Sequence, residues 1–182
     1  MFSSYTQIDE SQARLVLEGV PVAMRTLSWR AIANSLGSSV ASDIDAIRRD
    51  KSIRATDREA LIRTRLGQGQ YRQALLQRWN RACAVTGLRL DAALRASHIK
   101  PWCHSTNAER LDPANGLLLS ATIDALFDRG LISFDDDGAM LIADQVSASE
   151  CKKLGIPGAL RAPLSAAERC YLVVHRQRFG FA

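Results

Sequence analysis

The alternation of apolar and polar residues predicts a small strand, loop and strand unit in the middle of the chain. Residues 96–102 form a short apolar run closed by Pro101, which is typical of a strand that ends in a turn and places His98 near the strand end. A second apolar run, residues 117–119, follows the pair Asn-Gly at 115–116, which favours a turn with positive φ. We therefore expect the two runs to pair as a hairpin-like unit.

A helix and a second hairpin are predicted after these strands. Ser120 is placed to cap a helix that runs to about residue 129, and Gly130 is placed to end it. Two short β runs, residues 131–134 and 139–142, flank the turn sequence D-D-D-G and predict a hairpin. A calcium site at these three aspartates is the alternative, and a polar turn is the simpler interpretation.

The rest of the chain is predicted to be helical, which makes the fold class α+β. Capping boxes or amphipathic patterns predict helices near residues 8–17, 28–36, 56–66, 147–154 and 165–179, and G-Q-G-Q-Y at 67–71 is expected to break the third of these before another helix runs to Trp79. Residues 26–37 faintly resemble the first helix and turn of a helix-turn-helix, although packing alone also explains them. We divide the chain into an N-terminal helical region of unassigned role, 1–55, and a second domain, 56–182.

Two carboxylates on the predicted central helix are candidates for a metal site. Asp124 and Asp128 are four residues apart, so both lie on one helix face and repel each other unless a cation or water separates them. A hard divalent ion with oxygen ligands would relieve this repulsion. The alternative is that Asp128 pairs with Arg129 or another basic group and that Asp124 is solvated.

The order His98, Asn115, Asp124 resembles the HNH endonuclease family. The resemblance is carried by S-H-I-K-P-W, N-G-L-L-L-S and D-A-L-F-D-R-G-L-I, which follow one another within about forty residues. It implies a ββα-metal catalytic unit over about residues 83–134, flanked by N-terminal and C-terminal helices. It also implies that the protein cleaves nucleic acid.

The family resemblance implies a role for each of these residues. His98 would be the general base that takes a proton from the attacking water, and Asn115 would brace the loop and help to orient His98. Asp124 stands where the family usually has a histidine metal ligand, which favours Mg²⁺ or Mn²⁺ as the single divalent ion. Many relatives have an acidic residue or histidine directly before the base, but this chain has Ser97, so Asp128 is our candidate for the second ligand.

The distribution of charge suits a polyanionic partner. The net charge is +5, and residues 47–81 contain ten basic but only three acidic side chains. Such a segment can follow a phosphate backbone, or it can be an ordinary solvated helix face. The residues that we expect to contact DNA are Arg63, Arg65, Arg72, Arg95, Lys100 and Arg129.

The cysteines and the remaining histidines are not assigned chemistry. The four cysteines form no C-x-x-C pair, so the structural zinc site of many relatives is not expected. His104 is expected in an exposed loop, and His175 is expected to be a partly buried, non-functional residue of the last helix. With no secretory signal and no run of membrane-spanning length, we expect a cytoplasmic protein without a membrane partner.

The sequence thus predicts a metal-dependent endonuclease that hydrolyses DNA, with double-stranded DNA as its partner and a role related to restriction or phage defence. A DNA-binding or regulatory protein with a silent HNH scaffold is the main alternative, and an RNase is another. One site cuts one strand at a time, so clean double-strand cleavage would indicate a homodimer or two sequential nicks.

Overall fold

The computed structural model describes residues 38–181, which divide into two compact units between Gln73 and Ala74. The helices predicted at 8–17 and 28–36, with the helix-turn-helix resemblance, lie outside the described residues. Across residues 38–181, the helices are all too short or too polar to span a bilayer.

The first unit contains α3 (Ser38–Arg49) and most of α4 (Ala55–Arg78), whose last turn belongs to the second unit. Val40 and Ile44 of α3 and Leu66 of α4 are buried, and Asp43 pairs with Arg65 at 2.7 Å. This ion pair therefore joins the two helices.

The predicted break in α4 is wrong, because the helix continues through Gly67 and Gly69. It also begins at Ala55, one residue before the predicted start at residue 56. Both glycines are buried, and so is Tyr71 just beyond them. A glycine costs a helix about 1 kcal/mol, which burial of neighbouring apolar side chains outweighs.

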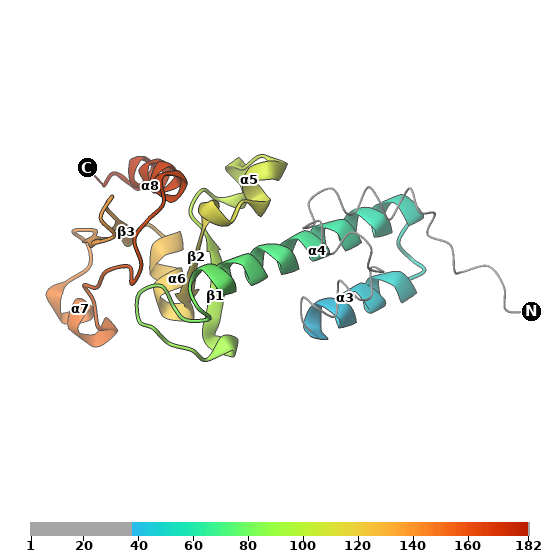
Figure 1. Cartoon of the computed structure of the whole chain (residues 1–182), viewed down its shortest axis with the longest axis horizontal. Coiled ribbons are helices and arrows are strands. Elements are labelled where there is room, and N and C mark those ends of the chain that lie inside the picture. The colour runs from blue at the N-terminus through green and yellow to red at the C-terminus, as the bar shows by residue number, and fades with distance from the viewer. Residues whose placement is uncertain (1–37, 182) are drawn as a thin grey trace, which may run out of the picture. The chain divides into compact units, whose positions relative to one another are not determined.

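The second unit is built around β1 (Leu94–His98), β2 (Gly116–Ser120) and α6 (Ala121–Asp128), as Figure 1 shows. The strands pair antiparallel with His98 opposite Gly116, and α6 packs against both. All of β2 is buried, in agreement with its continuous apolar run. The predicted strands and central helix are confirmed.

Two local details of this unit differ from the prediction. Gly116 has φ −156°, so no positive-φ turn occurs there. The connection from β1 to β2 is long and is built from η3 (Trp102–His104), α5 (Asn107–Leu111) and η4 (Pro113–Asn115), which makes a tight turn unnecessary. Ser120 occupies the N-cap of α6, but its side chain makes no capping hydrogen bond.

A buried thiol lies at the start of α6. Cys83 is 1 % exposed, and its Sγ accepts a hydrogen bond from the backbone N–H of Ser120 at 3.2 Å. The neighbouring Ala84 donates its N–H to the carbonyl of Leu118 at 2.7 Å. Residues 83–84 therefore anchor the chain against β2 before it enters β1 through η2 (Asp91–Ala93).

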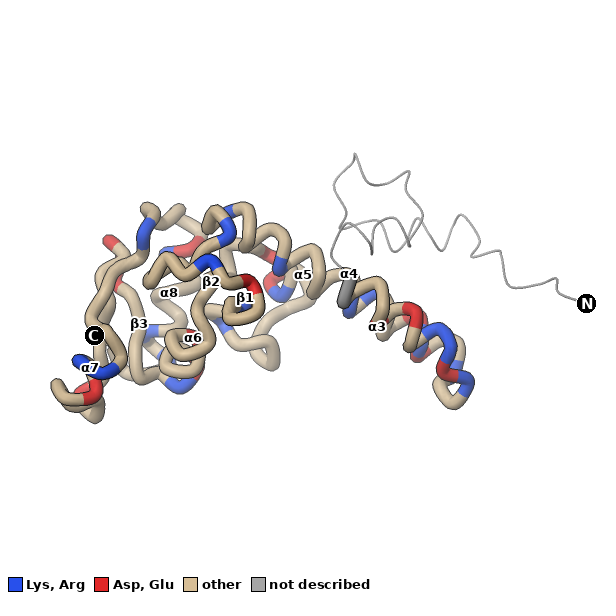
Figure 2. Tube along the Cα trace, turned by 90° about the horizontal axis from the view of Figure 1, so that it is seen from below, with Lys and Arg blue, Asp and Glu red and all other residues tan. Residues whose placement is uncertain are grey.

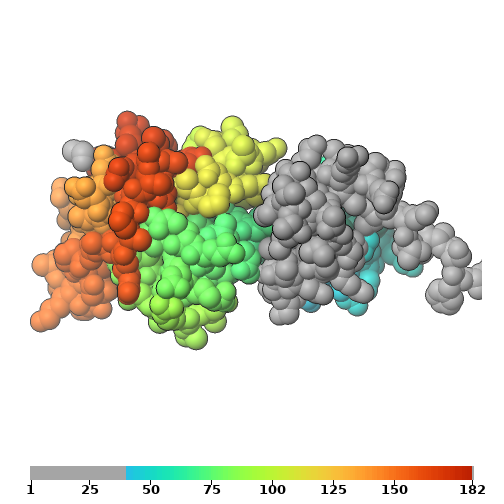
Figure 3. Space-filling model, in the orientation of Figure 1, coloured from blue at the N-terminus to red at the C-terminus, as the bar shows by residue number. Residues whose placement is uncertain are grey.

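The C-terminal elements complete the core of the second unit. β3 (Ile132–Phe134) and β4 (Met140–Ile142) form the predicted hairpin, followed by α7 (Ala148–Leu154) and α8 (Ala166–Phe179). The space-filling view in Figure 3 shows α8 beside the connection that carries α5. α8 packs against β3 and η4, so this helix covers the inner elements of the α+β fold.

Candidate active site

His98 lies at the end of β1 and is held by a backbone carbonyl. Its Nε2 is 3.0 Å from the carbonyl oxygen of Arg110, and because a carbonyl only accepts, the Nε2–H must donate. The indole of Trp102 meets the imidazole edge to face, with ring centroids 5.5 Å apart. The ring is therefore fixed in orientation, with its proton on Nε2.

The electrostatic surroundings of His98 keep it neutral. Burial lowers the pKa of His98 below its usual 6.5, while the hydrogen bond to the carbonyl of Arg110 and the charge of Asp128 oppose this shift. The neutral ring is the form that accepts protons near pH 7.

Asn115 is fully buried and organises the loop that follows His98. Its Oδ1 accepts the N–H of Lys100 at 2.7 Å, and its Nδ2 donates to the carbonyl oxygen of Glu109 at 3.0 Å. The backbone carbonyl of Asn115 also accepts the N–H of Ile99 at 3.1 Å. The two residues after His98 are thus both bonded to Asn115.

The same loop is closed by an ion pair. Lys100 Nζ lies 2.6 Å from Glu109 Oε1, and Glu109 also completes a capping box with Thr106. The hydrogen bond from Lys100 and that from the Thr106 backbone lower the pKa of Glu109 to about 2. The pair and the cap keep α5, and with it the carbonyl of Arg110, in place beside His98.

Asp124 and Asp128 lie on α6 close enough to influence each other. Burial of its carboxyl group raises the pKa of Asp128, the charge of Asp124 raises it further, and Ser97 and His98 act in the opposite direction. Ser97 Oγ is 3.5 Å from Asp128 Oδ1. The fold therefore brings Ser97, His98 and the two carboxylates together from β1 and α6.

Asp124 and Asp128 offer hard carboxylate oxygens of the kind that hold divalent cations. Within residues 38–181, no group of three or more His, Cys, Asp and Glu side chains is arranged to hold a metal. Zinc sites usually need three or four protein ligands, whereas Mg²⁺ keeps several waters and uses one or two carboxylates. The repulsion between Asp124 and Asp128 is the feature that a divalent cation would relieve.

The basic residues predicted near the site differ in their surroundings. Arg129 is exposed at the C-cap of α6, beside Asp128. Arg95 is exposed on β1, but its guanidinium donates to the carbonyl of Ala92 at 3.1 Å. Lys100 is committed to the ion pair with Glu109.

The predicted arginines of the first unit have partners of their own. Arg63 pairs with Glu59 along α4, and Arg65 pairs with Asp43 of α3. Arg72 is half-buried. Figure 2 shows acidic and basic residues interspersed along α3 and α4, so much of this charge is already balanced locally.

Sequence reasoning missed the groups that orient His98. Arg110 acts through its backbone carbonyl, for which no side-chain pattern exists. Glu109 could have been found, because T-x-x-E at 106–109 is a capping-box pattern. His175 was expected to be partly buried but is 2 % exposed and hydrogen-bonded at both ring nitrogens.

Residues 83–135 match the profile of one protein family, described as HNH endonuclease. The matched segment contains β1, the loop braced by Asn115, β2, α6 and β3. The search of curated proteins found no match to this chain.

Proposed function

Because residues 83–135 form a segment of the HNH endonuclease family, we propose that this protein is a metal-dependent endonuclease that hydrolyses DNA phosphodiester bonds. The observation that carries the proposal is His98, whose Nε2–H is bound by the Arg110 carbonyl and whose ring lies beside Asp128. We assign His98 as the general base and Asp124 as a metal ligand, with Asp128 as the second.

The proton transfer follows from the tautomer of His98. With its proton on Nε2, the neutral ring can accept another proton only at Nδ1. We assign Nδ1 as the atom that takes the proton from the water attacking phosphorus. The imidazolium that forms is stabilised by the nearby carboxylate of Asp128 and by the carbonyl of Arg110.

Asp124 and Asp128 would hold the divalent ion through their carboxylate oxygens. A bound ion supplies positive charge for the phosphate oxygens as negative charge develops on them. The family generally uses such an ion, and the pair of hard oxygen ligands favours Mg²⁺ or Mn²⁺.

The finer parts of the proposal rest on the family resemblance. They are double-stranded DNA as substrate, a homodimer where both strands are cut together, a cytoplasmic location, and a role in restriction or phage defence. Arg95, Arg129 and the arginines of α4 would contact the DNA backbone.

A second candidate is a DNA-binding protein whose HNH segment no longer cuts. One observation favours it, namely that no group of three or more His, Cys, Asp and Glu side chains within the described residues is arranged to hold a metal. In that case the segment would act as a scaffold.

Cleavage of supercoiled plasmid in Mg²⁺, Mn²⁺ or EDTA tests the proposal, with an RNA substrate alongside. We expect relaxation or linearisation that requires metal and is lost in His98→Ala and Asp124→Ala. His104→Ala is the matched control, because His104 is an exposed histidine of the adjoining turn and should retain activity.

Salt-sensitive plasmid binding without cleavage by the wild type would favour the scaffold. Cleavage of RNA in preference to DNA would show that RNA, and not DNA, is the substrate. Cleavage activity that persists in His98→Ala would show that His98 is not the general base.

A further inference from the structure

A helix outside the matched segment holds the end of α6. His175 of α8 is 2 % exposed, and its Nε2 is 3.1 Å from the carbonyl oxygen of Phe127. Its ring stacks on the phenyl ring of Phe127 with centroids 3.9 Å apart and planes 3° from parallel. Phe127 directly precedes Asp128, so His175 contacts the residue next to a proposed metal ligand.

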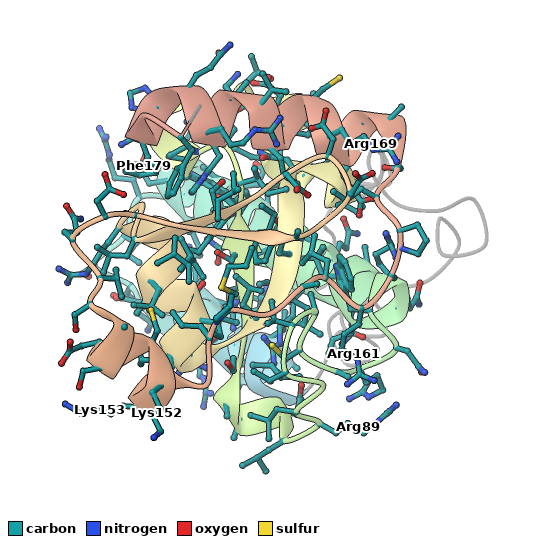
Figure 4. All side chains as sticks on the ribbon, turned by 90° about the vertical axis from the view of Figure 1, so that its left-hand side faces the viewer. Arg89, Lys152, Lys153, Arg161, Arg169 and Phe179 are labelled. Carbon is teal, nitrogen blue, oxygen red and sulfur yellow. The ribbon has the colours of Figure 1, made fainter. Side chains whose placement is uncertain are left out.

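The same turn is held at a second point. α6 ends with hydrogen bonds from Gly130 N to the Phe127 carbonyl and from Leu131 N to the Leu126 carbonyl, both 2.9 Å. Gly130 has φ +64°, and Phe179 lies over it so closely that a Cβ there would collide with the phenyl ring. Figure 4 shows Phe179 at the opposite end of α8 from Arg169.

His175 and Phe179 are four residues apart and therefore lie on one face of α8. His175 contacts Phe127 in the final turn of α6, and Phe179 lies against Gly130 just beyond that turn. This turn is the part of the helix from which the side chain of Asp128 projects, so α8 restrains the backbone that carries this carboxylate.

The hydrogen bonds of His175 define one tautomer. The Phe127 carbonyl can only accept, so Nε2 carries the proton, and Nδ1 accepts from Ser133 Oγ at 3.0 Å. Burial lowers the pKa of His175 to about 4, and the positive charges of Arg178 and Arg176 also lower it. The hydrogen bond to the Phe127 carbonyl acts in the opposite direction and raises this pKa. The neutral ring is thus a fixed donor toward α6.

We propose that His175 is a positioning residue for Asp128, and that α8 is consequently part of the metal-binding apparatus although it lies outside the matched segment. This inference rests on the proposed function, because it takes Asp128 as a metal ligand. A metal ligand must be held closely in place, and groups that orient ligands from behind typically change metal affinity 10- to 100-fold when they are lost.

Calorimetric measurement of Mn²⁺ binding to the full chain, with no nucleic acid present, tests the inference without relying on cleavage. His175→Phe keeps the stacking ring and removes the donor, whereas His175→Gln offers a replacement donor. We expect His175→Phe to weaken Mn²⁺ binding about tenfold and His175→Gln to recover part of the loss. Val174→Ala, an exposed position on the same helix, is the matched control and should bind as the wild type does.

Amide hydrogen exchange of the metal-free protein gives an independent result. We expect faster exchange at Gly130 and Leu131 in His175→Phe, relative to exchange in the rest of the core. If that variant does not fold, Ser133→Ala takes its place, because it removes only the partner of Nδ1.

The outcomes separate this inference from the proposed function. If Asp128→Asn weakens Mn²⁺ binding and His175→Phe does not, the positioning role is overturned and the nuclease proposal stands. If Asp128→Asn leaves Mn²⁺ binding unchanged, Asp128 is not a ligand, and both the second-ligand assignment and this inference fall.

Discussion

At the scale of single residues, backbone groups determine what the candidate catalytic side chains can do. The carbonyl of Arg110 decides which nitrogen of His98 carries the proton, and the N–H of Lys100 and carbonyl of Glu109 decide how Asn115 lies. A carbonyl persists whatever side chain its residue has. The orientation of His98 therefore depends on the course of the loop more than on the identity of residue 110.

Replacing Asn115 by alanine should destabilise the second unit by about 2–4 kcal/mol. The substitution leaves the N–H of Lys100 and the carbonyl of Glu109 without their buried partner, and each unsatisfied group costs about 1–3 kcal/mol. Urea unfolding followed by circular dichroism measures the loss.

The matched control for this substitution is Asn107→Ala. Asn107 is exposed and accepts one hydrogen bond from Arg110, so its loss should change the free energy of unfolding by less than about 1 kcal/mol. Equal effects at the two positions would show that the buried amide does not organise the loop.

His175 should make folding stability depend on pH. Its folded pKa is about 4, below the ordinary 6.5, so the unfolded chain binds a proton that the folded chain resists. This contribution is fully present above pH 6.5 and is lost as the pH falls toward 4, by an amount on the order of 3 kcal/mol. Below about pH 4 no further loss arises from this group.

Urea unfolding of the wild type and of His175→Phe between pH 4 and 7.5 isolates the effect of this histidine. Carboxylates titrate in both proteins, so only the difference between the two curves reports on His175. We expect that difference to shrink as the pH falls, and parallel curves would contradict the assignment.

At the scale of elements, the sequence predicted those strands and helices that local residue patterns determine. β2 and α6 follow from a continuous apolar run and from Gly130 as a stop, and the β3–β4 hairpin follows from its turn. The long connection between β1 and β2 could not be predicted, because contacts of Asn115 with residues 99–109 shape it. The continuity of α4 was missed because burial of its neighbours, rather than helix propensity, stabilises Gly67 and Gly69.

Gly130→Ala should lower the free energy of unfolding by at least about 2 kcal/mol. An alanine at φ +64° costs roughly 1–2 kcal/mol, and its methyl group would collide with Phe179. Thermal and urea unfolding of the single variants and of the double variant with Phe179→Ala complete a double-mutant cycle.

The cycle should be non-additive, because removing the phenyl ring also removes the collision. The double variant should therefore lose less than the two single losses combined. Full additivity would mean that Phe179 does not restrain the end of α6.

At the scale of the whole molecule, the excess of basic residues overstates the charge that is available to DNA. Ion pairs with Glu59 and Asp43 already engage Arg63 and Arg65, and Arg78 is bonded to the buried Glu168 at 2.9 Å. Counting charges along the sequence cannot detect such pairing, because Arg78 and Glu168 are far apart in the chain.

Salt dependence of DNA binding tests the arginines predicted to contact phosphate. If Arg63, Arg65 and Arg72 each bind one phosphate, replacing all three by glutamine should reduce the slope of log affinity against log salt by about three. Fluorescence anisotropy with a labelled duplex measures the slope. An unchanged slope would show that these arginines make only intramolecular interactions and do not contact the DNA phosphates.

The buried thiol of Cys83, at the start of α6, can report local opening of the second unit through its reactivity. Cys103 and Cys170 are exposed and should react at once with a thiol-specific reagent, whereas Cys83 is covered and bonded to the Ser120 N–H. Its labelling rate is consequently set by how often the junction of β2 and α6 opens. The rate of modification at Cys83 would therefore report how often this end of α6 opens, and ions or DNA that bind α6 should slow it.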